Sequence, residues 1–557
     1  MRPIFTFGAA FLAVGGLSRH TLAAPAELRG TWLTTTANTA IATPANTAAT
    51  MQNLRSIGLN TTYVEVWKNG FTEFPSQTMQ NLIGVSSQIN ASPGVPVQQR
   101  DLLAETLIES HRNGLTNIAW FEYGLMAKFG NPGTSSTDLA KYMADRGWLL
   151  QNSAGSFTTS SQGFSWMNPA VPQVRSLVKG IIMEAVRNYD LDGIQLDDHV
   201  GWPVQFGYDN YTRDAYLAET GLALPANPNN TQFKAWRASK VTSLMQEIIA
   251  EVKAVRPNMI VTVSPAVGGW AYDNFMVDWP AWQQQGMFDE FVPQVYRSSF
   301  SDFNRDWDGT GSITTQGQIQ YMGNRRHDFA AGIAINTSPL VSWTDAQQMV
   351  NLVRSTTPAV AGHVWWYSSS VLTTYPTQMA AYYDVAANGP AARPDLPEGW
   401  RAPSTVAVRD ASNLAIWTAA VPADGRYRII RKLGSTWTEI SNGVFGDGFL
   451  VLNLPGVDQV ELLIDRRPYL VGDANLNGAV NLDDFTVLAA NFGQTGKLWV
   501  QGDFTLDGTI NLDDFTALAA SFGQTLPGEA AARSSIPEPG GLAIVAVLAA
   551  AARRRRC

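Results

Sequence analysis

The feature that most constrains the fold is a regular alternation of short apolar segments with helical segments between residues 25 and 392. The apolar segments are rich in β-branched and aromatic residues, as is typical of buried parallel strands. Eight strands are predicted, at residues 28–33, 61–67, 116–121, 193–196, 259–264, 291–296, 331–335 and 361–366. Helices are predicted between them at residues 47–57, 101–113, 172–189 and 231–255. Eight strands that alternate with helices over about 360 residues predict a (β/α)8 barrel of the TIM type.

The fourth predicted strand ends in two adjacent carboxylates, Asp197 and Asp198, which His199 follows. In a (β/α)8 barrel the chemistry lies at the C-terminal ends of the strands. Because a strand alternates faces, the two carboxylates point in different directions, and their repulsion predicts a perturbed pKa for one of them. The alternative interpretation is a helix cap or an Asp pair held in salt bridges.

Other predicted strand ends carry further acids, with Glu65 near the end of the second strand and Glu122 directly after the third. Glycoside hydrolysis needs two carboxylates in an aromatic cleft, one neutral to protonate the leaving oxygen and one ionised. We therefore predict a glycoside hydrolase with the catalytic candidates Asp197, Asp198, Glu122 and Glu65, in which Glu122 is the acid and Asp197 the nucleophile or base. The alternative for Glu122 and Glu65 is a buried structural carboxylate. Candidate substrate-binding residues are Trp67, Tyr123, His199, Trp202, Gln294, Tyr296, Arg297, Trp365 and Trp366.

No phosphate-binding Gly loop, Ser-His-Asp order or metal-ligand spacing of Cys and His accompanies these residues, so no cofactor is predicted for catalysis. The sequence motifs are Arg29-Gly30-Thr31-Trp32-Leu33-Thr34, Tyr189-Asp190-Leu191-Asp192-Gly193-Ile194-Gln195-Leu196-Asp197-Asp198 and Pro293-Gln294-Val295-Tyr296. Because of these motifs, the predicted barrel resembles the glycosyl hydrolase-like ten family. The resemblance implies a glycosidase acting on cell-wall or other polysaccharide, since some members are linked to peptidoglycan glycan strands stripped of peptides. Unlike the commoner pattern, the chain has Glu65 for Gln, Phe121-Glu122-Tyr123 for Phe-Asn-Pro and His199 for Tyr.

Composition changes after the barrel, and residues 397–466 contain short alternating runs separated by turns. This pattern predicts a small, fibronectin-like β-sandwich without catalytic residues. A spacer and a sugar-binding module are the two interpretations of this segment.

Residues 469–525 contain a duplicated loop and helix with the oxygen-ligand spacing of EF-hand calcium loops. The segment resembles a type I dockerin, which implies structural Ca²⁺. A cohesin-like or cell-surface partner and a Ca²⁺-stiffened stalk are both consistent with it. The predicted metal ligands are Asp473, Asn475, Asn477, Ala479 and Asp484 in one loop, and Asp503, Thr505, Asp507, Thr509 and Asp514 in the other.

Both ends of the chain have the composition of targeting segments. Residues 1–24 combine a charged start, an apolar run and small residues, which predicts a signal peptide. After a linker at 526–535, residues 536–557 resemble a PEP-type sorting signal, which implies export and transient membrane contact; a plain tail anchor is the alternative. The net charge of −8 argues against a nucleic-acid partner. The rival function is a catalytically inactive glycan-binding or surface-display protein.

Overall fold

The computed structural model describes residues 26–526, except 37–38, 90–99, 310–315, 389–390, 395–407, 466–468 and the turns between the strands of residues 408–465. The predicted signal peptide, nearly all of the linker and the sorting signal lie outside the described residues. Within those residues, no helix is both long and apolar enough to cross a membrane.

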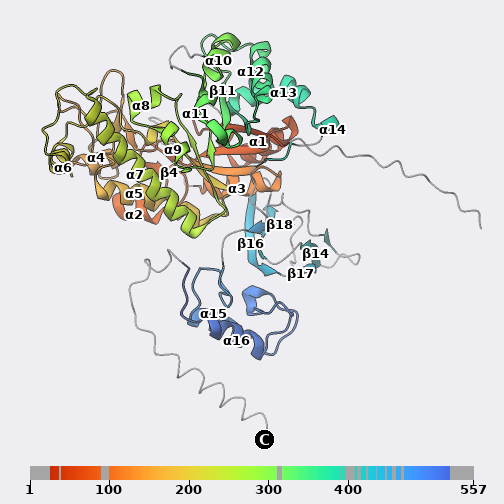
Figure 1. The fold of residues 1–557 in the computed structure, drawn as a ribbon. Coiled ribbons are helices and arrows are strands. Elements are labelled where there is room, and N and C mark those ends of the chain that lie inside the picture. Colours follow the sequence, from red (N-terminus) through yellow and green to blue (C-terminus); the bar gives the residue numbers. More distant parts are fainter. Residues whose placement is uncertain are drawn as a thin grey trace, which may run out of the picture.

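Eight parallel strands form one sheet in the order β10–β9–β8–β5–β2–β1–β12–β11 (Figure 1). Parallel bridges from Phe291 to Phe329 and from Gln294 to Gly332 join the two ends of this sheet, so the barrel is nearly closed. The predicted TIM-type barrel is therefore confirmed. The strands are β1 Leu28–Leu33, β2 Thr61–Glu65, β5 Thr116–Phe121, β8 Gly193–Asp197, β9 Ile260–Ser264, β10 Glu290–Phe291, β11 Ala330–Ala334 and β12 Gly362–Trp366.

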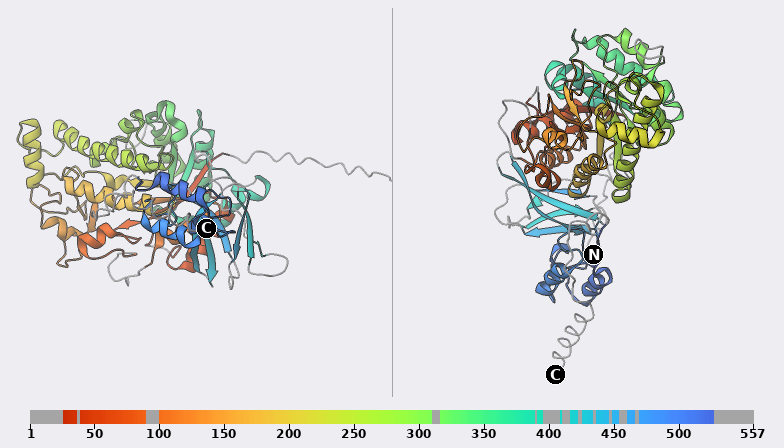
Figure 2. Two further views of the ribbon diagram at one scale, coloured as in Figure 1. Left: turned by 90° about the horizontal axis from the view of Figure 1, so that it is seen from below. Right: turned by 90° about the vertical axis from the view of Figure 1, so that its left-hand side faces the viewer.

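Helices cover the outside of the barrel (Figures 1 and 2). The longer ones are α1 Pro44–Ile57, α3 Leu102–Arg112, α5 Pro172–Asn188, α7 Thr231–Val255 and α12 Trp343–Ser355. The shorter ones are α2 Gln77–Ile83, α4 Leu139–Ala144, α6 Asn210–Thr220, α8 Trp270–Phe275, α9 Trp279–Gln284, α10 Phe300–Trp307, α11 Gln318–Tyr321, α13 Pro376–Tyr383 and α14 Val385–Asn388. Helical turns η1, η2 and η3 span Asp198–Val200, Gly323–Asp328 and Ser370–Thr374. Each long helix buries one apolar stripe against the strands, as Val174, Val178 and Ile181 of α5 do.

The sixth strand is predicted at 291–296, but the corresponding strand of the structure, β10, is much shorter and ends at Phe291. Pro293 lacks the N–H that a continuous ladder needs. Beyond it the Gln294 N–H still donates to the Pro265 carbonyl at 2.8 Å, so Gln294 remains at the end of the barrel.

Two small pairs of antiparallel strands that the sequence analysis did not predict follow the second and third barrel strands. One pairs β3 Trp67–Lys68 with β4 Phe71–Thr72, and the other pairs β6 Met126–Phe129 with β7 Phe164–Trp166. Both begin within five residues of a barrel strand, so they lie on the face of the barrel that carries the strand ends.

Side chains fill the inside of the barrel. The Trp32 indole donates to Gln195 Oε1 at 2.7 Å, and the Tyr63 hydroxyl donates to Glu290 Oε1 at 2.7 Å. Arg393 forms a buried ion pair with Glu290. The interior is therefore a packed core rather than a pore.

The chain after the barrel forms two antiparallel three-stranded sheets, ordered β13–β14–β17 and β16–β15–β18. In Figures 1 and 2 these strands lie between the barrel and helices α15 Leu482–Asn491 and α16 Leu512–Ser521. Val444 belongs to the same apolar cluster as Ala474 and Trp499, which connects β16 to the last module. The strands are β13 Val408–Arg409, β14 Ile416–Val421, β15 Gly425–Leu433, β16 Thr436–Phe445, β17 Gly448–Asn453 and β18 Val460–Asp465, and the turn η4 spans Trp499–Gln501.

Candidate active site

Asp197, the last residue of β8, is the most heavily hydrogen-bonded carboxylate at the barrel mouth. Its Oδ2 accepts the Trp120 indole N–H at 3.0 Å. Its Oδ1 accepts from the Ser264 hydroxyl at 3.0 Å, the Gln294 amide at 2.8 Å and the Asp198 backbone N–H at 2.8 Å. Only 2% of the residue is exposed. These four donors oppose the rise in the Asp197 pKa that burial causes.

Glu122 follows β5, and its carboxylate has fewer hydrogen-bond donors than that of Asp197. Its Oε2 is buried and has no hydrogen-bond partner among the described residues. A carboxylate oxygen of Glu122, one of Asp197 and a ring nitrogen of His199 lie within 4.8 Å of one another. Burial, followed by the charges of Glu65 and Asp197, raises the pKa of Glu122 well above its usual value, and Lys68 opposes the shift only in part. Glu122 therefore favours its protonated form.

Asp198 and His199 lie at the more open side of this cluster. The side chains of Asp198 and His199 are 19% and 24% exposed. His199 Nδ1 lies 3.0 Å from the Glu122 carbonyl oxygen and 3.6 Å from Asp198 Oδ1. Burial and the neighbouring Asp198 charge raise the pKa of Asp197, and the hydrogen bonds from the Asp198 N–H and Ser264 oppose the shift. The adjacent carboxylates do not point apart as the alternation of a strand predicts, because the Gln294 side-chain amide donates both to Asp197 Oδ1 at 2.8 Å and to Asp198 Oδ1 at 3.3 Å.

Glu65 forms an ion pair below the surface. It is 2% exposed, accepts the Thr35 backbone N–H at 2.6 Å and lies 3.2 Å from Lys68 Nζ. Lys68 also donates to the Thr36 hydroxyl at 2.8 Å. The sequence analysis missed Lys68, and its position three residues after Glu65 was the only available signal. The contacts fit the alternative interpretation of Glu65, a buried carboxylate held by hydrogen bonds.

Two aromatic side chains form a wall at the barrel mouth. The rings of Tyr296 and Trp366 stack with centroids 5.8 Å apart and an interplanar angle of 27°. Both rings also contact Trp32, at 6.4 and 6.0 Å. Burial, followed by the charges of Asp197 and Asp198, raises the pKa of the Tyr296 hydroxyl, so this residue stays neutral. These two predicted binding residues therefore lie together beside the carboxylates.

Three of the predicted binding residues lie inside the core instead. Trp67, Trp202 and Trp365 are 1%, 0% and 0% exposed. Each indole N–H donates to a protein oxygen at 2.9 to 3.1 Å. A substrate-binding role does not fit these three residues, because tertiary packing covers them on all sides.

Two further predicted residues are held by their neighbours. Arg297 forms an ion pair with Asp306 and donates to the Tyr296 carbonyl at 2.7 Å. Tyr123 is 8% exposed and its ring contacts Phe164 edge-on at 5.8 Å. Arg297 is thus paired with Asp306 rather than with Asp197.

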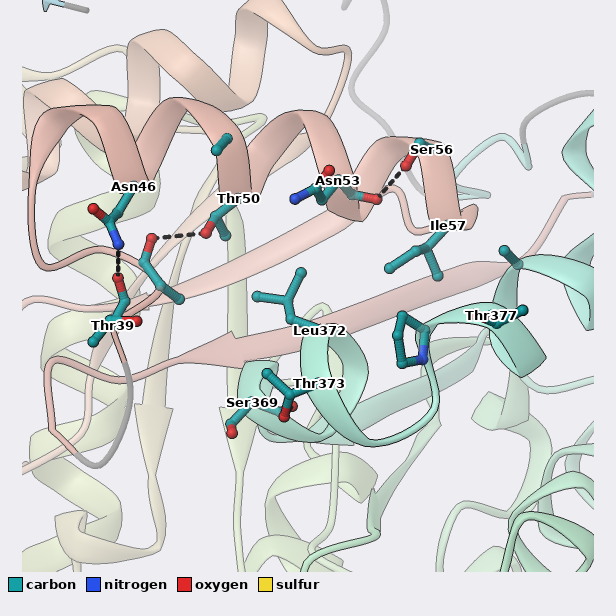
Figure 3. A pocket seen from close by; sticks show the side chains of 14 residues that line it. Thr39, Asn46, Thr50, Asn53, Ser56, Ile57, Ser369, Leu372, Thr373 and Thr377 are labelled. Atoms are coloured by element: carbon teal, nitrogen blue, oxygen red, sulfur yellow. Dashed lines mark hydrogen bonds between the residues drawn. The ribbon is translucent and has the colours of Figure 1, made fainter.

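A separate hollow of about 760 Å³ lies between α1 and the segment that contains η3 and α13 (Figure 3). The described residues that line it include no charged side chain and none of the predicted site residues. Figure 3 shows hydroxyl and amide groups on both walls, among them Thr39, Asn46, Thr50, Ser369, Thr373 and Thr377. The hollow is therefore distinct from the carboxylate cluster.

The two predicted calcium loops have closely similar backbones. Leu476 and Leu506 occupy equivalent positions with φ of 54° and 60°. Asp473 accepts the Gly478 N–H at 2.7 Å, and Asp503 accepts the Gly508 N–H at 2.9 Å. Each loop thus wraps around the first carboxylate of its repeat.

The second loop also contains a buried oxygen that lacks a partner. Asp503 Oδ1 is buried without a hydrogen bond among the described residues. Burial, together with the charges of Asp514 and Asp507, raises the pKa of Asp503. A cation among these oxygens would satisfy Oδ1 and neutralise the repulsion, so the donor set fits Ca²⁺.

A parallel barrel with several carboxylates at its strand ends is an arrangement that suits glycosidases. Residues 27–345 match the Glycosyl hydrolase-like 10 family, and the chain belongs to that family. This confirms the resemblance of the barrel. The family and its relatives support a hydrolase-like protein that acts on glycans.

Two curated relatives are both named glycosyl hydrolases. Glycosyl hydrolase DigH of Escherichia coli (strain K12) is 26% identical over 311 residues, which cover 48% of this chain and 65% of that protein. Glycosyl hydrolase YngK of Bacillus subtilis (strain 168) is 23% identical over 339 residues, covering 54% and 58%. The chain thus spans less than two thirds of either relative. Among solved structures, the PgaB (BpsB) glycoside hydrolase domain from Bordetella bronchiseptica aligns with a TM-score of 0.44 and 11% identity, covering 65% of this chain and 99% of that one.

Proposed function

We propose that the chain is an exported glycoside hydrolase that cleaves the O-glycosidic bonds of a polysaccharide or cell-wall glycan with a pair of carboxylates. Glu122 is the general acid and Asp197 the nucleophile. The observation that carries the proposal is the contrast between the two groups: Asp197 accepts four hydrogen bonds, whereas Glu122 Oε2 has no partner among the described residues. When two close acids share one proton, the proton resides on the carboxyl that has fewer donors.

The two steps of the reaction follow from this distribution of charge. Glu122 gives its proton to the glycosidic oxygen while Asp197 attacks the anomeric carbon, so the leaving sugar departs as an alcohol. The Glu122 carboxylate then takes a proton from water, and the hydroxide displaces Asp197 from that carbon. The two acids have oxygens within 4.8 Å of each other, which supports retaining geometry, where carboxyl groups lie about 5–5.5 Å apart.

The neighbouring groups support this assignment. The charge of Glu65 is the second cause of the raised Glu122 pKa. Lys68 is within 3.2 Å of Glu65, so the cation is bound to that carboxylate. Asp198 is more exposed than Asp197 and would be the next candidate for the nucleophile.

The test is the release of reducing ends from a panel of polysaccharides that includes denuded peptidoglycan strands. Asp197→Asn should lower the rate by at least about 10³-fold because it removes the attacking charge and keeps the shape. Asp214→Asn, on the exposed side of α6, is the matched control and should act like the wild type. Near-wild-type turnover by Asp197→Asn would move the role to Asp198, and a wild type that releases nothing would favour the catalytically inactive glycan-binding or surface-display protein.

For the C-terminal module we propose two structural Ca²⁺ ions, one in each loop. The first would be held by Asp473, Asn475, Asn477, Asp484 and the carbonyl of Ala479, and the second by Asp503, Thr505, Asp507, Asp514 and the carbonyl of Thr509. The unpartnered Asp503 Oδ1 supports this. The module would serve as a stiff stalk or bind a cohesin-like or cell-surface partner, ahead of a C-terminal sorting signal that contacts the membrane transiently.

A further inference from the structure

Two of the exposed large apolar side chains lie in loops on the catalytic face. Phe129 is 58% exposed and ends β6, in the strand pair β6–β7 that follows β5. Trp270 is 38% exposed and begins α8, in the segment that follows β9. In the sheet, β5 and β9 are the two neighbours of β8, the strand that carries Asp197. The two aromatic side chains therefore belong to the loops on either side of the carboxylates.

A continuous path of ring contacts links these two side chains. The centroids of successive rings along the path are 5.1, 6.3, 6.1, 5.9 and 5.5 Å apart. The path passes through His199, which contacts the Glu122 carbonyl. It consists of Phe129, Phe164, His199, Trp166, Phe275 and Trp270.

Buried neighbours hold the two exposed rings in place. Trp166 is 1% exposed and Phe275 is 8% exposed, so the middle of the path is part of the core. The Phe129 N–H donates to Asn69 Oδ1 at 2.9 Å. The ring of Phe129 lies over Gly163, where an added Cβ would approach it to 3.2 Å. Rings that are already rigid lose little entropy on binding.

We infer that Phe129 and Trp270 are stacking platforms for the distal sugar rings of a glycan that crosses the barrel mouth over His199. Sugar rings present apolar C–H faces and polar rims, which match a rigid aromatic face in water. Because the platforms follow the strands on both sides of β8, the ligand is a chain that extends in both directions from the carboxylates. This inference rests on the proposed function and adds that the enzyme cuts within long chains.

The test measures binding in the Asp197→Asn background of the full chain, so that no ligand is consumed. The probes are short and long members of three series, the chito-, cello- and malto-oligosaccharides, titrated by calorimetry. Phe129→Ala and Trp270→Ala should each weaken binding of the longest bound oligomer by about twofold to tenfold, the range expected for one aromatic contact. The loss should grow with oligomer length. Leu217→Ala, which removes an exposed apolar side chain of α6 (51% exposed) outside the path, is the matched control.

Length-dependent loss in both variants, with unchanged melting temperatures, would support the platforms. Equal loss at every length, or unchanged affinity, would overturn them, as would binding of no oligomer in any series. Failure of the proposed function gives a different pattern: the wild type then releases no reducing ends, whereas length-dependent binding and its loss in the variants persist. A soluble protein that binds at Phe129 and Trp270 while the oligomers do not would assign the surface to a protein partner instead.

Discussion

Glu122→Gln should impair catalysis and at the same time stabilise the folded barrel at neutral pH. A general acid contributes about 10²–10⁴-fold to rate, so substrates with poor leaving groups should lose about that factor. Aryl glycosides, whose leaving group needs little protonation, should lose far less in the first step. Glutamine keeps the size of the side chain and cannot donate a titratable proton.

The stability effect has a definite sign. The folded-state pKa of Glu122 is raised by burial and by the charges of Glu65 and Asp197. Between the unfolded and the folded pKa, the native state binds more protons than the unfolded state, so stability falls as pH rises through that window. Glutamine does not titrate and avoids this loss. The variant should therefore melt at a higher temperature than the wild type at neutral pH and match it below about pH 4.

Turnover on the two substrate types and thermal melting from about pH 4 to about pH 9 test this reasoning together. Glu27→Gln is the matched control with the opposite sign. Burial alone would raise the pKa of Glu27, but the hydrogen bond and charge of Arg354, with Arg29 and His363, lower it to about 2. Glu27 therefore stabilises the fold above its unfolded pKa, and its replacement should cost on the order of 3 kcal/mol at neutral pH. Equal loss of rate on both substrates, with a lower melting temperature for Glu122→Gln, would refute the acid role.

Three further outcomes are expected. Proton NMR of a freshly cleaved glycoside should show the product with the anomeric configuration of the substrate, and an inverted product would exclude Asp197 as nucleophile. Trp120→Phe removes the donor to Asp197 Oδ2, and since a hydrogen bond to a charged group is worth about 1.5–3 kcal/mol, kcat should fall by about 10- to 150-fold while the acid limb of the pH profile moves up. A chelator should lower the melting temperature of the module that contains Asp473 and Asp503 and spare barrel turnover, because binding to the folded state stabilises only the module that binds; loss of turnover would reveal a catalytic metal.

The barrel could be predicted because its strands are recorded in local composition. Seven of the eight predicted strands closely match the strands in the structure, since buried parallel strands need a short apolar run wherever they occur. The prediction of a strand at 291–296 was wrong in length, because Pro293 has no N–H and interrupts the hydrogen bonds between strands. This reason was visible in the sequence. The strand pairs β3–β4 and β6–β7 could not be predicted, since strands of two to four residues leave no periodic pattern in the sequence.

The site could be predicted only as far as the residue types. Tryptophan serves both cores and sugar platforms, and exposure alone separates Trp365, at 0%, from Trp270, at 38%. Exposure is set by tertiary packing, which the sequence does not record. The Trp120 indole donates to Asp197 across neighbouring strands, a contact that the residue type alone does not predict. Lys68 meets Glu65 because β3 begins two residues after β2 ends, which brings side chains three residues apart together.

The choice of donors around Asp197 explains how two acids so close together can hold different charges. A cation beside Asp197 would stabilise the Asp197 carboxylate. The long-range field of that cation would also favour ionisation of Glu122, which has an oxygen within 4.8 Å of an Asp197 oxygen. Neutral N–H and O–H donors act over hydrogen-bond distance only, so the groups of Trp120, Ser264 and Gln294 stabilise the Asp197 carboxylate without favouring ionisation of Glu122. The nearby cations fit this division of charge, because Lys68 is paired with Glu65 and Arg297 with Asp306. In the proposed mechanism, short-range neutral donors and pre-paired cations would together keep a proton on Glu122 while Asp197 carries the charge that attacks carbon.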